Sequence, residues 1–254
     1  HIDLQACRKR GIVVSNVPTY GEETVAEHTF ALLLGLSRKL VAGVERTKQG
    51  SFLLEGLRGF DLQGKTIGIV GGGRIGQHVA RIAKGFEMKI LVFDVNQDRQ
   101  LSKKLGFRYV SLEMLLRQSD IVTLHIPYTT PTHHLLNAER LKLMKQGSYL
   151  LNTSRGGIVD THALVSALKS RHLAGAGLDV LEEENHLCEE VALLTKEGIQ
   201  QCNLQTVLED HILLRMPQVL ITPHNAVNTK EALQRIIDTT IANIQAFEKG
   251  KPMN

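Results

Sequence analysis

Short, continuous runs of apolar residues recur along the chain at intervals that suit a regular sheet. A strand with one face in water alternates apolar and polar side chains, whereas an unbroken apolar run is typical of a strand buried on both faces. We therefore expect a sheet whose two faces are both covered. The runs that predict its strands are residues 12–14, 66–70, 89–93, 121–126, 148–152, 175–180 and 219–222.

The stretches between these runs have the period of an α-helix, with apolar residues returning at helical spacing. Strands that alternate with helices form βαβ units, which associate into a parallel sheet with helices on both faces. The sequence thus predicts an α/β fold with a doubly wound parallel sheet of the Rossmann type. The helical stretches are residues 74–84, 112–117, 138–144 and 162–169.

Two predicted helices stand outside this alternation. The first begins near Thr24, where Thr24 and Glu27 have the spacing of a capping box, and continues towards Gln49. Residues 30–36 are apolar on nearly all sides of this helix, so we expect it to be buried. A homodimer interface is the favoured explanation, and a second layer of the same chain is the alternative. The second helix follows Asn228, and we expect its apolar stripe to pack on the core: Leu233, Ile236, Ile237, Ile241 and Ile244.

Composition and charge narrow the classes of function. Of the 254 residues, 43% are apolar and 22% are charged, as is usual in globular proteins. The longest apolar runs fall far short of the roughly 18 residues of a membrane-spanning helix, so we expect no membrane partner. Thirty basic and 26 acidic residues give a net charge of +4, and the basic residues are scattered. This pattern argues against a nucleic-acid partner and leaves small anionic ligands open.

The cysteines give no sign of a metal site or of disulfide bonds. Cys7, Cys188 and Cys202 lie far apart and form no Cys-x-x-Cys motif. We therefore expect no bound metal ion and a reducing compartment, the cytoplasm.

A glycine-rich motif lies between the predicted strand at 66–70 and the helical stretch that follows it. Its glycines, Gly71, Gly73 and Gly76, have Gly-x-Gly-x-x-Gly spacing, with Arg74 and Ile75 between the last two. In such motifs the first glycine allows a tight turn, the second lets a pyrophosphate approach the backbone, and the third lets the helix pack closely. Backbone N–H groups and the helix dipole favour the anion. The motif predicts a dinucleotide site.

An acidic residue, Asp94, ends the next predicted strand, 18 positions after Gly76. A carboxylate at this distance accepts hydrogen bonds from the adenosine ribose hydroxyls. It would repel a 2′-phosphate, and the following Val95 and Asn96 provide no arginine to bind one. The predicted cofactor is therefore NAD rather than NADP.

Three polar residues follow successive predicted strands: Arg155, Glu184 and His224. Ligands of open α/β sheets bind at the carboxyl ends of the strands, so these residues are expected at the same edge as the glycine motif. Arg155 offers a permanent charge that matches a carboxylate, and His224 exchanges protons near neutral pH. A carboxylate beside His224 would stabilise its protonated form. Taken singly, each residue could instead be a structural ion-pair partner, a solvated charge or a packed core group.

Several linked motifs resemble those of the NAD-dependent D-2-hydroxyacid dehydrogenases, most closely their D-lactate dehydrogenase branch. The resemblance extends from Ile2 to Lys251. The motifs are Asn16-Val-Pro18 with Val25-Ala-Glu-His28, the glycine motif, Leu124-His-Ile-Pro127, Asn152 to Asp160, Gly177-Leu-Asp-Val180 with Glu184, and Thr222-Pro-His224.

The resemblance assigns roles to individual residues. It implies that Arg155 binds the substrate carboxylate and carbonyl, that His224 is the acid/base, and that Glu184 is the carboxylate partner of His224. Glu182 and Glu183 are neighbouring candidates for that partner, but the distance from Asp179 favours Glu184. By the same resemblance Asp179 holds the nicotinamide carboxamide. The expected cofactor-binding residues are Gly71, Gly73, Arg74, Ile75, Gly76, Asp94, His125, Pro127, Thr153 and Asp179.

The resemblance also implies a domain organisation and an activity. Residues 1–20 would be the remnant of a flavodoxin-like substrate domain, 21–226 the NAD-binding Rossmann domain, and 227–254 a helix returning towards the substrate domain. The expected reaction interconverts a D-2-hydroxy acid, D-lactate, and its 2-keto acid. We expect this chain alone to bind NAD but to turn over substrate poorly. Open alternatives are an NADH-sensing scaffold similar to corepressors, and a dehydrogenase for glycerate, phosphoglycerate or phenyllactate.

Overall fold

The computed structural model describes residues 2–184 and 203–250. Contacts divide the chain into two compact units. One is formed by Val25–Ala226, and the other by His1–Thr24 with Val227–Asn254.

A parallel sheet of seven strands forms the centre of the larger unit. Its strand order is β3-β2-β1-β4-β5-β6-β7, so the chain reverses its direction of winding between β1 and β4. In doubly wound sheets this reversal marks the ligand crevice. The strands are β1 (Thr66–Val70), β2 (Lys89–Phe93), β3 (Arg108–Tyr109), β4 (Ile121–Leu124), β5 (Ser148–Asn152), β6 (Leu173–Leu178) and β7 (Val219–Ile221).

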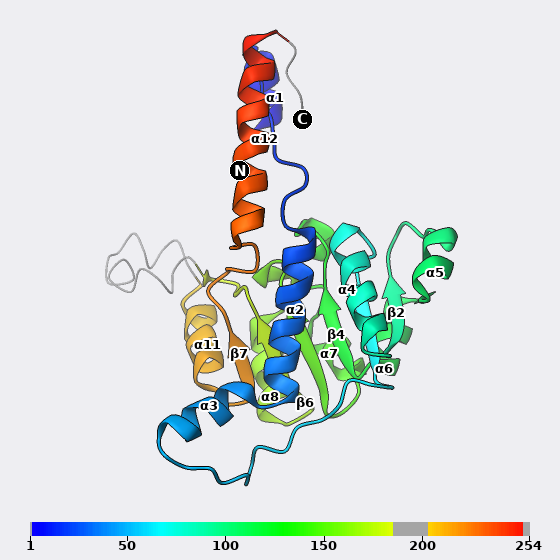
Figure 1. Ribbon diagram of the computed structural model, residues 1–254, viewed down its shortest axis with the longest axis vertical. Helices are drawn as coiled ribbons and strands as arrows, with labels where there is room; N and C mark the ends of the chain where they lie inside the picture. The colour runs from blue at the N-terminus through cyan, green and yellow to red at the C-terminus, as the bar shows by residue number, and fades with distance from the viewer. Residues whose placement is uncertain (1, 185–202, 251–254) are drawn as a thin grey trace. The chain divides into compact units, whose positions relative to one another are not determined.

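Two hydrophobic clusters cover the two faces of the sheet. Successive residues of a strand point to opposite faces, and accordingly Ile69 belongs to one cluster and Val70 to the other. The predicted doubly wound α/β fold is therefore confirmed, and both faces are apolar because both are covered (Figure 1). The helices of this alternation are α4 (Arg74–Gly85), α5 (Arg99–Leu105), α6 (Leu112–Gln118), α7 (Ala138–Leu143), α8 (Thr161–Lys169) and α11 (Leu204–Arg215).

Helix α2 (Glu22–Ser37) differs from its prediction at both ends. It begins at Glu22, so the expected capping box at Thr24 is wrong, because Thr24 already lies in the first turn. The predicted single helix to Gln49 is also wrong. The chain turns at Lys39, whose φ is 53°, and a separate helix, α3 (Leu40–Lys48), follows.

The apolar sides of α2 are buried by the sheet of the same unit. Phe30, Leu32 and Leu33 are each at most 4% exposed. Helix α2 lies close to strand β6, because a Cβ added to Gly177 of β6 would lie 3.1 Å from the Cβ of Leu32. The alternative explanation, a second layer of the same chain, thus accounts for the apolar run of α2.

The smaller unit contains α1 (Leu4–Lys9) and α12 (Lys230–Glu248). Residues 12–14, predicted as a strand, form no strand within the described residues, and Ile12 is 53% exposed. The prediction that the apolar stripe of α12 packs on the core is wrong for most of its residues. Four of them are between 47% and 55% exposed: Leu233, Ile237, Ile241 and Ile244. No described helix is both long enough and apolar enough to cross a membrane.

Candidate active site

The register of the sheet brings five loops to one edge. Val70 pairs with Leu124, Leu124 with Asn152, Asn152 with Leu178, and Leu178 with Ile221. The loops that begin after these aligned residues therefore leave the sheet side by side. They contain the glycine motif and the segments after β4, β5, β6 and β7.

The glycine motif forms a tight turn that only glycine fits at two positions. Gly71 has a φ of 104°, and an added Cβ would lie 2.3 Å from the carbonyl oxygen of His125. A Cβ on Gly76 would lie 2.0 Å from the carbonyl oxygen of Gly71. In contrast, a Cβ on Gly73 would meet nothing within 4 Å, so the start of α4 faces open space. This backbone fits a pyrophosphate at the helix N-terminus.

Asp94, directly after β2, lies against the glycine motif. Its Oδ2 accepts a hydrogen bond from the Gly72 N–H at 2.6 Å, and its Oδ1 accepts one from Asn96 N–H at 2.8 Å. The carboxylate therefore has a fixed position beside the turn. A fixed anion there suits ribose hydroxyls and opposes a 2′-phosphate.

His125 contributes a neutral imidazole beside the glycine motif. Burial lowers the pKa of His125 to about 3, and its Nε2 lies 2.9 Å from Thr123 Oγ1. Its buried Nδ1 has no partner among the described residues. A buried polar atom without a partner at this edge is compatible with a ligand-binding role. Of the other predicted cofactor residues, Arg74 and Pro127 are exposed, and Ile75 is half-buried.

The structure brings Glu184 and His224 together. His224 Nδ1 lies 2.7 Å from Glu184 Oε1, and the two side chains are 44% and 32% exposed. Because Glu184 occupies Nδ1, Nε2 is the nitrogen through which His224 can exchange a proton with a substrate. His224 also has a φ of 50°, a conformation that a residue with a Cβ rarely adopts.

Arg155 occupies the neighbouring loop, after β5. Its side chain is exposed, and its Nη1 donates to the carbonyl oxygen of Ser154 at 2.6 Å. Within the described part of the chain it makes no hydrogen bond to Glu184 or His224. The guanidinium therefore remains available to an anionic ligand at the same edge.

The three consecutive glutamates have different partners. Glu182 accepts hydrogen bonds from Thr161 Oγ1 at 2.8 Å and pairs with His134 Nε2 at 2.6 Å. The N–H of Glu183 donates to Asp210 Oδ2 at 3.2 Å. Among the three side chains, the structure places Glu184 against His224.

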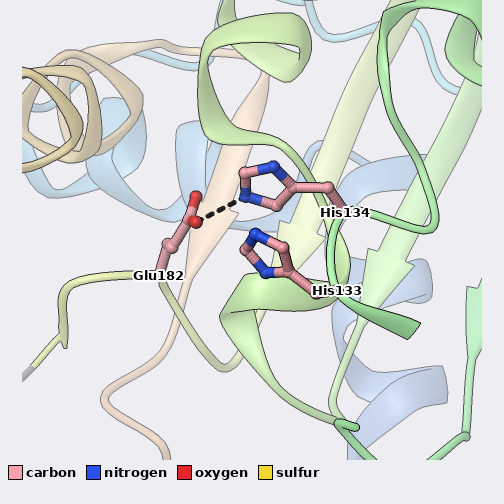
Figure 2. Close-up of side chains that lie close together, drawn as sticks. All are labelled: His133, His134 and Glu182. Carbon is pink, nitrogen blue, oxygen red and sulfur yellow. Dashed lines mark hydrogen bonds and ion pairs between the residues drawn. The ribbon is translucent and has the colours of Figure 1, made fainter. Parts of the chain in front are cut away.

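Glu182 also belongs to a cluster with His133 and His134, whose potential metal-binding atoms lie within 4.8 Å of one another. Figure 2 shows the two imidazole rings beside the carboxylate. The rings are stacked, with centroids 3.8 Å apart and planes inclined by 24°. Imidazole lone pairs lie in the ring plane, so these two cannot converge on one ion unless the stack opens. The arrangement is that of a histidine–glutamate pair covered by a second ring.

Asp179 lies beneath the loop that carries His224. It is 1% exposed, and its carboxylate accepts hydrogen bonds from Thr222 Oγ1 at 2.5 Å and from the N–H groups of Asn225 and Ala226 at 3.0 and 2.9 Å. Burial alone would raise the pKa of Asp179, but the bonds from His28, Thr222 and these backbone groups outweigh it and lower the pKa. The contact with a nicotinamide carboxamide stays a prediction.

Sequence reasoning missed two contributors, His28 and Thr29. His28 Nε2 lies 2.9 Å from Thr222 Oγ1 and 3.3 Å from Asp179 Oδ1, and Thr29 Oγ1 lies 3.1 Å from Thr153 Oγ1. The motif ending at His28 is part of the resemblance, but the partners of His28 and Thr29 are 194 and 124 positions away along the chain. No local pattern could have identified them.

Comparisons with known proteins identify a family, relatives and solved structures to which this chain is similar. Residues 30–226 match the family described as the NAD binding domain of D-isomer specific 2-hydroxyacid dehydrogenases. The chain is 41% identical over 257 residues to a 2-hydroxyacid dehydrogenase homolog of Zymomonas mobilis, covering 100% of this chain and 74% of the relative. It is 40% identical to a glyoxylate reductase of Pyrococcus furiosus, covering 99% and 70%. The crystal structure of a D-lactate dehydrogenase from Aquifex aeolicus, complexed with NAD and lactic acid, superposes with a TM-score of 0.88 at 41% identity, covering 98% of this chain and 73% of that one.

Proposed function

The chain belongs to the D-isomer specific 2-hydroxyacid dehydrogenases, an NAD-binding family, and we propose that it interconverts D-lactate and pyruvate. The observation that carries this proposal is the 2.7 Å contact between His224 Nδ1 and Glu184 Oε1 at the edge that holds the glycine motif. Carbonyl reduction needs a proton donor of this kind close to the cofactor.

Each of the three polar residues has a distinct task in the proposed reaction. NAD, when bound, supplies or takes up the hydride equivalent. Arg155 binds the substrate carboxylate and polarises the carbonyl group. The Nε2 of His224 delivers a proton to the carbonyl oxygen during reduction and removes it during oxidation. Glu184 holds Nδ1 and stabilises the imidazolium form.

The proposed cofactor contacts follow from the same edge. The N–H groups at Gly73, Arg74 and Ile75 would hold the pyrophosphate, and Asp94 would bind the adenosine ribose. His125, Pro127, Thr153 and Asp179 would line the nicotinamide half. The fixed carboxylate of Asp94 favours NAD over NADP.

The site is open to water in this chain, as the exposure of Arg155, His224 and Glu184 shows. Positioning of substrate and exclusion of water both require a closed site. A polypeptide of these 254 residues alone is therefore proposed to bind NADH and to reduce pyruvate slowly.

The proposal includes a homodimer, but not one that uses the buried sides of α2. One group of exposed apolar residues lies on α3 and in the segment after it, where Phe52 is 82% and Leu54 is 81% exposed. Side chains of this size are rarely left in water in such a group. A second copy of the chain is the proposed partner of this surface, which comprises Leu40, Val41, Val44, Phe52, Leu53 and Leu54.

A substrate comparison tests the proposed activity. NADH oxidation by the purified protein is measured with pyruvate, glyoxylate, hydroxypyruvate and phenylpyruvate. Pyruvate is expected to have the highest kcat/KM, about tenfold above glyoxylate, because contact with one additional methyl group contributes a factor of this order. A preference for glyoxylate would overturn D-lactate as the substrate while keeping the reaction class. The absence of NADH oxidation with every acid would overturn the proposed activity itself.

A further inference from the structure

Two adjacent side chains of the buried helix α2 contact two different loops of the candidate active site. His28 reaches Thr222, two residues before His224, and Thr29 reaches Thr153, two residues before Arg155. Thr29 is 0% exposed and Thr153 is 8% exposed. One helix therefore has polar contacts with both loops that carry the proposed acid/base and the proposed substrate-binding cation.

The direction of these hydrogen bonds can be assigned. Thr29 donates its one hydroxyl hydrogen to the carbonyl oxygen of Val25 at 2.8 Å, so Thr153 is the donor in the contact with Thr29. Thr222 donates its hydrogen to the carboxylate of Asp179, so His28 must donate through Nε2–H to Thr222 or Asp179. This fixes the hydrogen of His28 on Nε2.

The Asp179 carboxylate links His28 to the position of His224. It accepts the N–H groups of Asn225 and Ala226, the two residues that follow His224. His224 is held at a φ of 50°, which a side chain disfavours and which persists only where the surroundings enforce it. The hydrogen bonds that connect His28, Thr222 and Asp179 with the backbone after His224 hold it in this conformation.

The loop with Arg155 is held in a parallel way. Asn152 Oδ1 accepts the N–H of Ser154 at 3.0 Å, and Asn152 Nδ2 donates to the carbonyl oxygen of Arg155 at 2.9 Å. Thr153 lies between them and is joined to α2. The Arg155 backbone is therefore fixed by the end of β5 on one side and by Thr29 on the other.

We propose that His28 and Thr29 are positioning residues of the active site, Thr29 for Arg155 and His28 for His224. The inference rests on the proposed function, because it uses the roles given there to Arg155 and His224. It predicts that the two residues affect different kinetic parameters. Displacement of a substrate-binding group raises KM, whereas displacement of the acid/base lowers kcat.

Thr29→Val tests the first half. Valine has nearly the same shape but no hydroxyl, so Thr153 loses its acceptor. The KM for the 2-keto acid is expected to rise about tenfold, a larger change than the fall in kcat, because Arg155 binds the substrate carboxylate. Thr29→Ser restores the hydroxyl and should restore KM. Thr240→Val is the matched control, since Thr240 makes the same bond to the carbonyl oxygen four residues earlier but lies on exposed α12.

His28→Leu tests the second half. The kcat is expected to fall about tenfold with little change in KM, and His28→Gln, which keeps an N–H donor, should recover most of it. Amide hydrogen exchange supplies a readout that needs no activity. The N–H groups of Asn225 and Ala226 should exchange about tenfold faster in His28→Leu, whereas those of the central strands stay protected.

The outcomes separate this inference from the proposed function. If the wild type reduces no 2-keto acid, the proposed function fails, and faster exchange at Asn225 and Ala226 in His28→Leu would still support the contact network. If the wild type is active but both variants keep KM, kcat and exchange within twofold, the positioning roles are wrong. A rise in KM together with falls in kcat, NADH affinity and Tm that are equal in both variants would also overturn them, because that pattern is general destabilisation.

Discussion

At the scale of single residues, the charge of Glu184 is expected to matter more than its shape. Its Oε1 lies 2.7 Å from Nδ1 of His224, and its Oε2 accepts the N–H of Leu181 at 3.3 Å. The carboxylate is thus oriented by its own segment. A charged partner stabilises the imidazolium more than a neutral acceptor does.

Glu184→Gln removes this charge and keeps an acceptor of similar size. We expect kcat to fall about 10²-fold, while the Kd for NADH changes little. Steady-state kinetics and NADH fluorescence measure the two quantities. Glu183→Gln is the neighbouring control, and an equal loss in both variants would contradict the assignment of Glu184.

Asp210 shows how a buried carboxyl changes stability with pH. It is 0% exposed, its Oδ1 has no partner among the described residues, and burial raises its pKa from 3.8 to about 7. The folded state therefore keeps a proton that the unfolded state loses near pH 4. The free energy of unfolding should fall between about pH 4 and pH 7 through this group, and the loss should persist at higher pH.

Asp210→Asn replaces the buried carboxyl group with an amide that does not ionise. The Tm of this variant is expected to rise relative to the wild type at pH 8 and to change much less at pH 5, as thermal unfolding at the two values would reveal. Asp238→Asn, on the exposed side of α12, is the control and should show no such difference. A lower Tm at pH 8 would mean that the ionised carboxylate stabilises the fold.

At the scale of elements, local patterns predicted the strands better than the helix ends. The six runs between residues 66 and 222 each overlap a strand of the sheet, because burial on both faces leaves a continuous apolar run. The two-residue β3 is too short to produce such a run. The sequence did not predict the break between α2 and α3 at Lys39, because lysine rarely adopts a positive φ.

The segment after α3 is part of the proposed homodimer surface, and a substitution in it tests the dimer. Phe52→Glu places a charge in the most exposed apolar position of this surface, so the proposed homodimer should dissociate. Analytical ultracentrifugation is expected to show a dimer for the wild type and a monomer for the variant. Val95→Glu, another exposed apolar residue at 87% exposure, should leave the dimer intact. A monomeric wild type would contradict the proposal.

At the scale of the whole molecule, the order and register of the strands assemble the site. The sequence identified the glycine motif, Asp94 and the three polar residues because each follows a recognisable strand. The contacts that hold them are not local: His28 and Thr222 are 194 positions apart, and Thr29 and Thr153 are 124 apart. Only the packing of α2 on the sheet brings these pairs together (Figure 1).

The most direct test of the central claim is the initial rate of NADH formation from D-lactate and from L-lactate, measured for the wild type and for His224→Asn. We expect NADH from D-lactate only, and a rate lower by about 10³-fold in His224→Asn with unchanged NAD affinity. Equal oxidation of L-lactate, or a His224→Asn rate within tenfold of the wild type, would contradict it.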